Sequence, residues 1–137
     1  NTEYMQTEKE DLYVYKLLSH MEVDKDTTLL NISSFDIGLY TVSGIVPNCY
    51  WFQTQTLPLD DVLMEQENYI REGKIDYIVA REYYPAVAEE NYEVIAREDD
   101  EARETFFYLL KKKEKSCIQE MYLNLLTRIS CGVIAIL

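Results

Sequence analysis

The side chains that could do chemistry in this chain are its carboxylates, a single histidine and three cysteines. Cys49, Cys117 and Cys131 include no pair with the CxxC spacing of a zinc or redox site. His20 lies on a predicted helix with no motif around it, so a Cys–His nucleophile is not expected. The sequence also lacks a phosphate-binding glycine loop, a nucleophile elbow, an HExxH helix and a calcium loop. We therefore predict no catalytic residue, no metal site and no cofactor.

Three side chains near predicted strand ends are the candidates for ligand binding: Asp36, Tyr40 and Arg81. Open α/β sheets bind ligands beyond the carboxyl ends of their strands, and Asp36 follows the first predicted strand. Its carboxylate could contact a sugar or a phosphosugar, although a helix N-cap is the favoured interpretation. Arg81 follows a later strand and could bind an anion. For Arg81 the favoured interpretation is an ion pair with Glu82 or another nearby carboxylate.

Hydrophobic periodicity predicts the elements that would position these candidates. Apolar runs at residues 28–32 and 75–80 are typical of buried strands, and residues 50–53 are expected to form a short strand between them. Residues 59–72 carry an apolar stripe at helical spacing, and Gly73 should end that helix. Strands that alternate with helices indicate a mostly parallel sheet with helices on its faces.

Two further helices and a hairpin complete the predicted fold. Residues 8–21 have helical spacing, and Thr7 with Glu10 fits a capping box at their start. A short helix within residues 36–44 is expected to end at Gly44, whereas residues 81–90 are interpreted as a loop.

Near the end of the predicted domain, two β-rich runs at residues 92–97 and 105–110 surround an acidic turn at 98–101 and indicate an antiparallel hairpin. The predicted fold class is therefore α/β, a three-layer Rossmann-like domain with a mostly parallel central sheet and a C-terminal antiparallel hairpin.

Chain length and net charge limit the classes of partner that this chain can bind. The chain has 137 residues, enough for one domain, and a formal net charge of -12. This charge argues against nucleic acid and anionic lipid headgroups as direct partners, because both require a basic face. Most of the twelve tyrosines fall in predicted strands and helices, which favours core or half-buried positions over a sugar-binding aromatic surface.

The chain divides into a soluble α/β domain over residues 1–113 and a tail over residues 114–137. Residues 118–126 have helical spacing, and the apolar stretch at 129–137 is shorter than the ~20 residues that a membrane-spanning helix needs. Three interpretations of the tail stay open: a helix packed on the domain, a truncated membrane segment, or sequence foreign to the native protein. The start at Asn1, without an initiator methionine, suggests a fragment of a longer protein.

Several segments in order carry a resemblance to a known family: residues 1–5, 9–11, 28–31, 38–47, 66–70, 73–79, 92 and 108–112. Together they resemble the extracytoplasmic C-terminal domain of GT-C-type multi-pass membrane glycosyltransferases of Gram-positive bacteria. These enzymes are related to dolichyl-phosphate-mannose protein mannosyltransferases. The resemblance covers residues 1 to about 113, and the tail does not match it.

The resemblance implies a role rather than a reaction for this chain. In such enzymes the membrane-embedded part holds the catalytic acidic residue and uses a polyprenyl-phosphate sugar as donor. The chain would then be a non-catalytic domain on the extracytoplasmic side of the cell membrane, beside the transmembrane region of its own parent protein. It would contact acceptor cell-wall glycan or a lipid-linked sugar. The alternative is a stand-alone ligand-binding or structural interaction module with a Rossmann-like fold.

Overall fold

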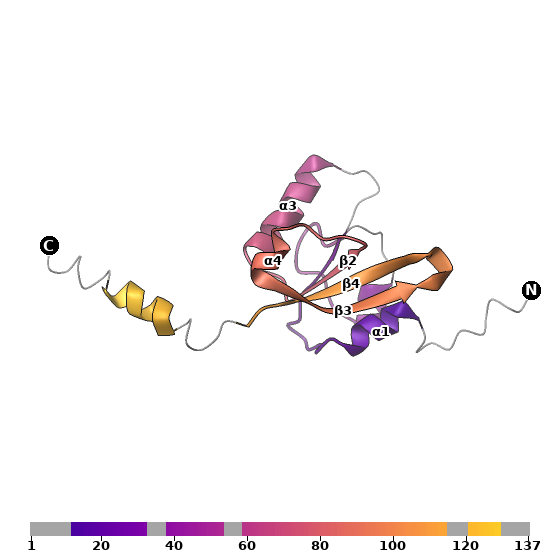
Figure 1. Ribbon diagram of the computed structural model, residues 1–137, viewed down its shortest axis with the longest axis horizontal. Helices are drawn as coiled ribbons and strands as arrows, with labels where there is room; N and C mark the ends of the chain where they lie inside the picture. Colours follow the sequence, from indigo (N-terminus) through magenta and orange to yellow (C-terminus); the bar gives the residue numbers. More distant parts are fainter. Residues whose placement is uncertain (1–11, 33–37, 54–58, 115–120, 130–137) are drawn as a thin grey trace, which may run out of the picture.

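The computed structural model describes residues 12–32, 38–53, 59–114 and 121–129, and within them it is a mixed α/β structure around one open sheet (Figure 1). The four strands lie in the order β1-β2-β4-β3. Their bounds are β1 (Leu29–Ile32), β2 (Tyr77–Arg81), β3 (Tyr92–Asp100) and β4 (Thr105–Lys112). The β1–β2 pair is parallel, whereas β2–β4 and β3–β4 are antiparallel. The expectation of a mostly parallel sheet is therefore wrong, and the expected C-terminal hairpin is confirmed.

The sheet has fewer parallel pairs than expected because residues 50–53 form no strand. A backbone hydrogen bond from the Asn31 amide to the Phe52 carbonyl, at 2.8 Å, ties this segment to the outer edge of β1. The Phe52 ring also meets the Tyr40 ring edge to face, with centroids 5.0 Å apart. The aromatic residues that suggested a strand thus hold the segment by side-chain packing instead of a hydrogen-bonded ladder.

Helices precede and separate the strands. Their bounds are α1 (Tyr13–Ser19), α2 (Leu39–Ser43), α3 (Asp60–Arg71) and α4 (Ala88–Asn91). The first three lie within the predicted helical stretches, while α4 lies at the end of the predicted loop 81–90, so that prediction is wrong for the loop's last residues. The α4 turn begins where the Ala88 amide donates to the Pro85 carbonyl at 2.9 Å, and the Ala88 side chain is fully buried. The predicted capping box at Thr7 lies outside the described residues.

Hydrophobic side chains form two separate clusters, and successive strand residues alternate between them. One cluster joins α1 and α2 to the sheet: Tyr13, Val14, Leu17, Leu29, Leu39, Ile45, Tyr77, Val79, Phe107 and Leu109. The other joins α3 and α4 to the sheet: Leu30, Ile32, Ile70, Ile75, Ile78, Ala80, Ala88, Tyr92 and Leu110. Figure 1 shows α1 and α3 on opposite sides of the strands. Both faces of this part of the sheet are therefore covered by apolar side chains.

Glycines end two helices where the sequence predicts it. Gly44 has φ +73° after α2, and Gly73 has φ +64° just after α3. A side chain at either position would be strained in this left-handed conformation. The hairpin turn lies later than predicted, because β3 extends to Asp100 and a 3₁₀ turn at Glu101–Arg103 follows it.

A further helix covers residues 121–129, within the tail where helical spacing begins at 118. All nine of its residues are exposed. Over the described ranges, no helix combines the length and the apolar character that crossing a membrane requires.

Candidate functional site

The structure describes two of the three ligand-binding candidates predicted near strand ends, Tyr40 and Arg81. Asp36 lies outside the described residues. The Tyr40 hydroxyl lies 2.8 Å from the carbonyl oxygens of both Leu29 and Phe52. The polar end of Tyr40 thus joins α2 to β1 and to the segment that runs beside it.

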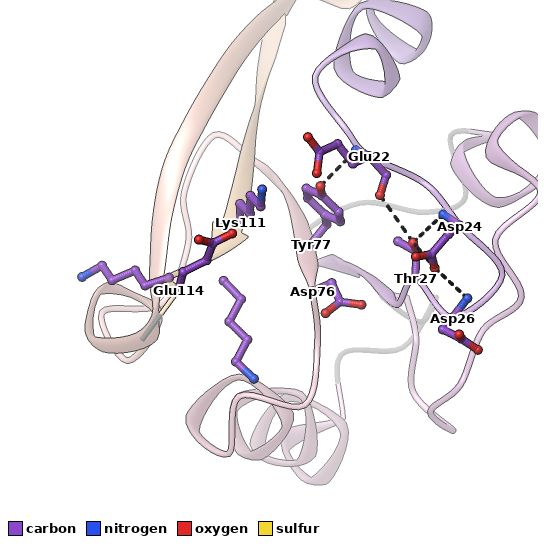
Figure 2. Close-up of a pocket in the computed structure, with 10 residues that line it drawn as sticks. Glu22, Asp24, Asp26, Thr27, Asp76, Tyr77, Lys111 and Glu114 are labelled. Atoms are coloured by element: carbon purple, nitrogen blue, oxygen red, sulfur yellow. Dashed lines mark hydrogen bonds between the residues drawn. The ribbon is translucent and has the colours of Figure 1, made fainter. Parts of the chain in front are cut away.

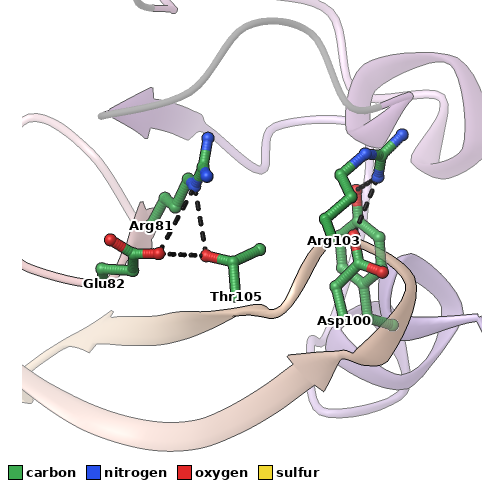
Figure 3. A network of polar contacts seen from close by, with 6 residues as sticks. Arg81, Glu82, Asp100, Arg103 and Thr105 are labelled. Carbon is green, nitrogen blue, oxygen red and sulfur yellow. Dashed lines mark hydrogen bonds and ion pairs between the residues drawn. The ribbon is translucent and has the colours of Figure 1, made fainter.

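Arg81 is held by its neighbours at the end of β2 (Figure 3). Its Nε donates to the Thr105 hydroxyl at 3.1 Å and lies 3.8 Å from Oε1 of Glu82. The Thr105 hydroxyl in turn donates to the same Glu82 oxygen at 2.5 Å. The structure therefore contains the ion pair that the sequence favoured for Arg81. Glu82 adopts φ +61°, a strained conformation for a residue with a side chain.

A second basic residue at this end is also paired. Arg103 donates to Oδ2 of Asp100 at 2.9 Å and to the Tyr13 hydroxyl at 3.3 Å. Asp100 is buried, and burial raises the pKa of the Tyr13 hydroxyl. The Tyr13 ring stacks on Phe107 with centroids 4.7 Å apart. We call Tyr13, Arg81, Glu82, Asp100, Arg103 and Thr105 the carboxyl-end network.

The opposite end of the parallel pair contains an open cavity of about 900 Å³ (Figure 2). Its walls come from residues 22–27 before β1, residues 76–77 at the start of β2, and residues 111–114 at the end of β4. We call this cavity the amino-end pocket. Antiparallel pairing places Lys111 opposite Tyr77, so the last residues of β4 lie beside the first residues of β2.

Hydrogen bonds fix the backbone around the amino-end pocket. Oδ2 of Asp76 accepts from both the amide and the hydroxyl of Thr28 at 2.9 Å, and the Thr28 hydroxyl accepts from the Asp76 amide at 2.8 Å. The Tyr77 hydroxyl accepts from the Glu22 amide at 3.0 Å. Nearby, the Asp24 amide donates to the Thr27 hydroxyl at 2.8 Å. The entries to β1 and β2 are thereby joined to each other and to the turn before them.

Charged groups of both signs remain available in this pocket. Lys112 and Lys113 donate to the carbonyls of Gly73 and Glu89, at 2.6 and 2.7 Å. Among the residues that line the pocket, Glu22, Asp26, Lys111 and Glu114 have side chains without a hydrogen bond or ion pair to another described residue. Figure 2 shows Glu22, Lys111 and Glu114 around one cavity. Carboxylates accept hydrogen bonds from sugar hydroxyls, and an ammonium group donates to hydroxyl or phosphate oxygens.

Sequence reasoning missed this pocket. None of the residues that line it was among the ligand-binding candidates, which were Asp36, Tyr40 and Arg81. The signal that could have found it is the placement of residues 22–27 and 111–114 at strand ends. A sequence pattern alone does not reveal that an antiparallel β4 brings them together.

His20 and Cys49 are the histidine and the cysteine within the described residues. His20 lies 3.2 Å from Glu98 and joins α1 to β3, with its side chain 43% exposed. Burial raises the pKa of the Cys49 thiol, which disfavours the reactive thiolate. Within the ranges that the structure covers, no three His, Cys, Asp or Glu side chains are grouped to hold a metal ion.

No protein-family model matches this chain, and no curated protein or solved structure matches it significantly.

Proposed function

We propose that this chain is a non-catalytic domain that binds a carbohydrate, free or linked to a phosphate, in the amino-end pocket. We further propose that it is the extracytoplasmic domain of a membrane glycosyltransferase that uses a polyprenyl-phosphate sugar donor. The sequence resemblance supports the second statement. The observation that carries the first is the open cavity of about 900 Å³ in which carboxylates and an ammonium group lie without partners among the described residues.

The chemistry of the walls selects the ligand class. Pockets for apolar ligands are lined mostly by hydrophobic and aromatic side chains, whereas this one offers Tyr77 among nine polar or charged residues. Many hydroxyl groups on one ligand would match the alternating carboxylates and lysines. Lys111, which has no partner among the described residues, supplies the positive charge for a phosphate group.

The proposal also includes the arrangement of helices and sheet in layers. We infer a three-layer Rossmann-like arrangement, and the two apolar clusters support it because each joins different helices to the sheet. The ligand would then lie at the amino ends of the parallel strands, opposite to the usual position in such sheets.

NMR chemical-shift mapping on the 137-residue chain tests the proposal. The probes are a neutral cell-wall oligosaccharide and a water-soluble, short-chain polyprenyl-phosphate hexose. Shifts at Thr27, Asp76, Tyr77 and Lys111 are expected with at least one probe. Shifts with the phosphate-linked probe alone would assign the donor, and shifts with both would assign the sugar itself. Saturating titrations that move no amide signal would contradict a carbohydrate-binding role.

A further inference from the structure

The helix at residues 121–129 exposes an apolar surface that has no cover in the described structure. Its three leucines are between 43% and 56% exposed: Leu123, Leu125 and Leu126. Met121 and Tyr122 are more exposed, at 71% and 62%. An isolated helix of this length is marginal in water, because too few hydrogen bonds offset the cost of nucleation. A contiguous exposed apolar face on such a helix therefore indicates a binding surface.

The residues of this helix separate into two faces. At about 100° per residue, the apolar residues fall on one continuous arc of about 200°. These are Met121, Tyr122, Leu123, Leu125, Leu126 and Ile129. Asn124, Thr127 and Arg128 occupy the remaining arc, so the helix is amphipathic, and its only charge is positive.

Charge distinguishes this part of the chain from the rest. Residues 111–129 contain five cations and two carboxylates, whereas the whole chain has a net charge of -12. A cation-bearing segment that continues into an amphipathic helix is typical of a chain that binds an anionic lipid surface. A second copy of this chain is a poorer match, because association would bring two strongly acidic bodies together.

We propose that the helix at residues 121–129 binds an anionic lipid surface. Its apolar face enters the boundary between headgroups and acyl chains, while Arg128 lies near the lipid phosphates. The acidic remainder of the chain is repelled by the same surface and stays in water. The net charge of the whole chain, which argues against lipid as a partner, thus conceals a local segment of opposite sign. This inference does not depend on the carbohydrate pocket.

Co-sedimentation of the 137-residue chain with lipid vesicles tests the proposal. One vesicle preparation contains phosphatidylcholine with phosphatidylglycerol, and the other contains phosphatidylcholine alone. The chain should sediment with the anionic vesicles, bind the neutral ones more weakly, and be released as salt is raised. The double variant L125Q/L126Q should bind anionic vesicles at least about tenfold more weakly, because each substitution removes buried apolar area. The charge-matched control N124Q/T127Q changes only the polar face and should bind as the original chain does.

Three results would overturn the proposal. The first is no sedimentation with anionic vesicles at low salt. The second is an equal loss of binding in L125Q/L126Q and in N124Q/T127Q. The third is concentration-dependent dimerisation that L125Q/L126Q abolishes without any vesicle binding, which would assign the apolar face to a second copy. Circular dichroism and thermal unfolding should be unchanged in both variants, since these side chains are exposed.

Discussion

The two ends of the parallel β1–β2 pair differ in whether their charged side chains have partners within the described structure. At the carboxyl end, Arg81 lies near Glu82, and Arg103 binds Asp100. At the amino end, the backbone is tied by hydrogen bonds, but Lys111 and several carboxylates have no partner among the described residues. A charge at a strand end therefore indicates a ligand site only when the fold does not already neutralise it.

The hairpin explains why the usual end of the sheet is occupied. Because β4 runs antiparallel to β2, the turn that begins β4 lies at the carboxyl end of β2. The Glu82 amide donates to the Phe106 carbonyl at 3.1 Å, and Thr105 reaches both Arg81 and Glu82. The start of β4 therefore lies beside the end of β2, where an all-parallel sheet would place the next loop of a ligand crevice.

Phe107→Ala should have the largest effect on the carboxyl end. Its ring is 2% exposed and stacks on Tyr13, so the truncation should lower the free energy of unfolding by about 3–5 kcal/mol. Urea denaturation measures the change. The control Phe106→Ala removes a half-buried ring that lies under the Arg97 guanidinium, and it should cost about 1 kcal/mol. If both variants lost the same free energy of unfolding, the stacking of Phe107 on Tyr13 would not be what stabilises the carboxyl-end network.

Tyr92→Phe should cause the next largest loss of stability, at the amino end of β2. The Tyr92 hydroxyl is buried and donates to the Ile75 carbonyl at 2.7 Å, so its removal leaves that carbonyl unsatisfied and should cost about 1–3 kcal/mol. Burial raises the pKa of Tyr92 to about 12, above its ordinary value of 10.0. The folded state therefore keeps a proton that the unfolded state loses. The stability from Tyr92 is complete below pH 10 and is lost as the pH rises towards about 12.

Urea denaturation across this pH range checks the sign of the linkage. The difference in stability between the original chain and Tyr92→Phe should be constant up to pH 10 and then shrink. A difference that stays constant to pH 12, or grows, would contradict a raised pKa for the buried hydroxyl.

The sequence predicted the elements of this fold better than their pairing. The apolar runs at residues 28–32 and 75–80 and the glycine at 73 are local signals, and the structure has β1, β2 and the end of α3 within about two residues of the predicted places. Residues 50–53 lie beside β1 without joining the sheet, and contacts of Phe52 with the Asn31 amide and the Tyr40 ring hold them there. Such long-range packing leaves no periodic trace in the sequence.

The candidate site shows the same limit. Arg81 and its Glu82 partner are neighbours in sequence, so their ion pair was predictable. Lys111 and Tyr77 are far apart in sequence, and only the register of β2 with β4 places them side by side. The amino-end pocket therefore depends on a strand pairing that hydrophobic patterns do not specify.

Glu104→Gly should have a smaller effect and of opposite sign. Glu104 follows the hairpin turn with φ +52°, where glycine is unstrained, so the substitution should raise the free energy of unfolding by about 0.5–1 kcal/mol. Thermal unfolding measures the change. The comparison is Glu82→Gly, because Glu82 has φ +61° but also accepts from Thr105. Glu82→Gly should gain no stability, and an equal gain in both variants would show that the Thr105 contact contributes nothing.

Lys111→Gln and Arg81→Gln should have the smallest effects on stability and the most decisive effect on function. Both side chains lie at least partly exposed, and the Arg81–Glu82 pair is a surface ion pair worth at most about 1 kcal/mol. Isothermal titration calorimetry with the polyprenyl-phosphate hexose measures which end of the sheet binds the ligand. Lys111→Gln should weaken binding by about tenfold through loss of a charge-assisted hydrogen bond, while Arg81→Gln should leave it unchanged. A loss confined to Arg81→Gln would place the ligand at the carboxyl end, where Arg81 would have to exchange Glu82 and Thr105 for the phosphate.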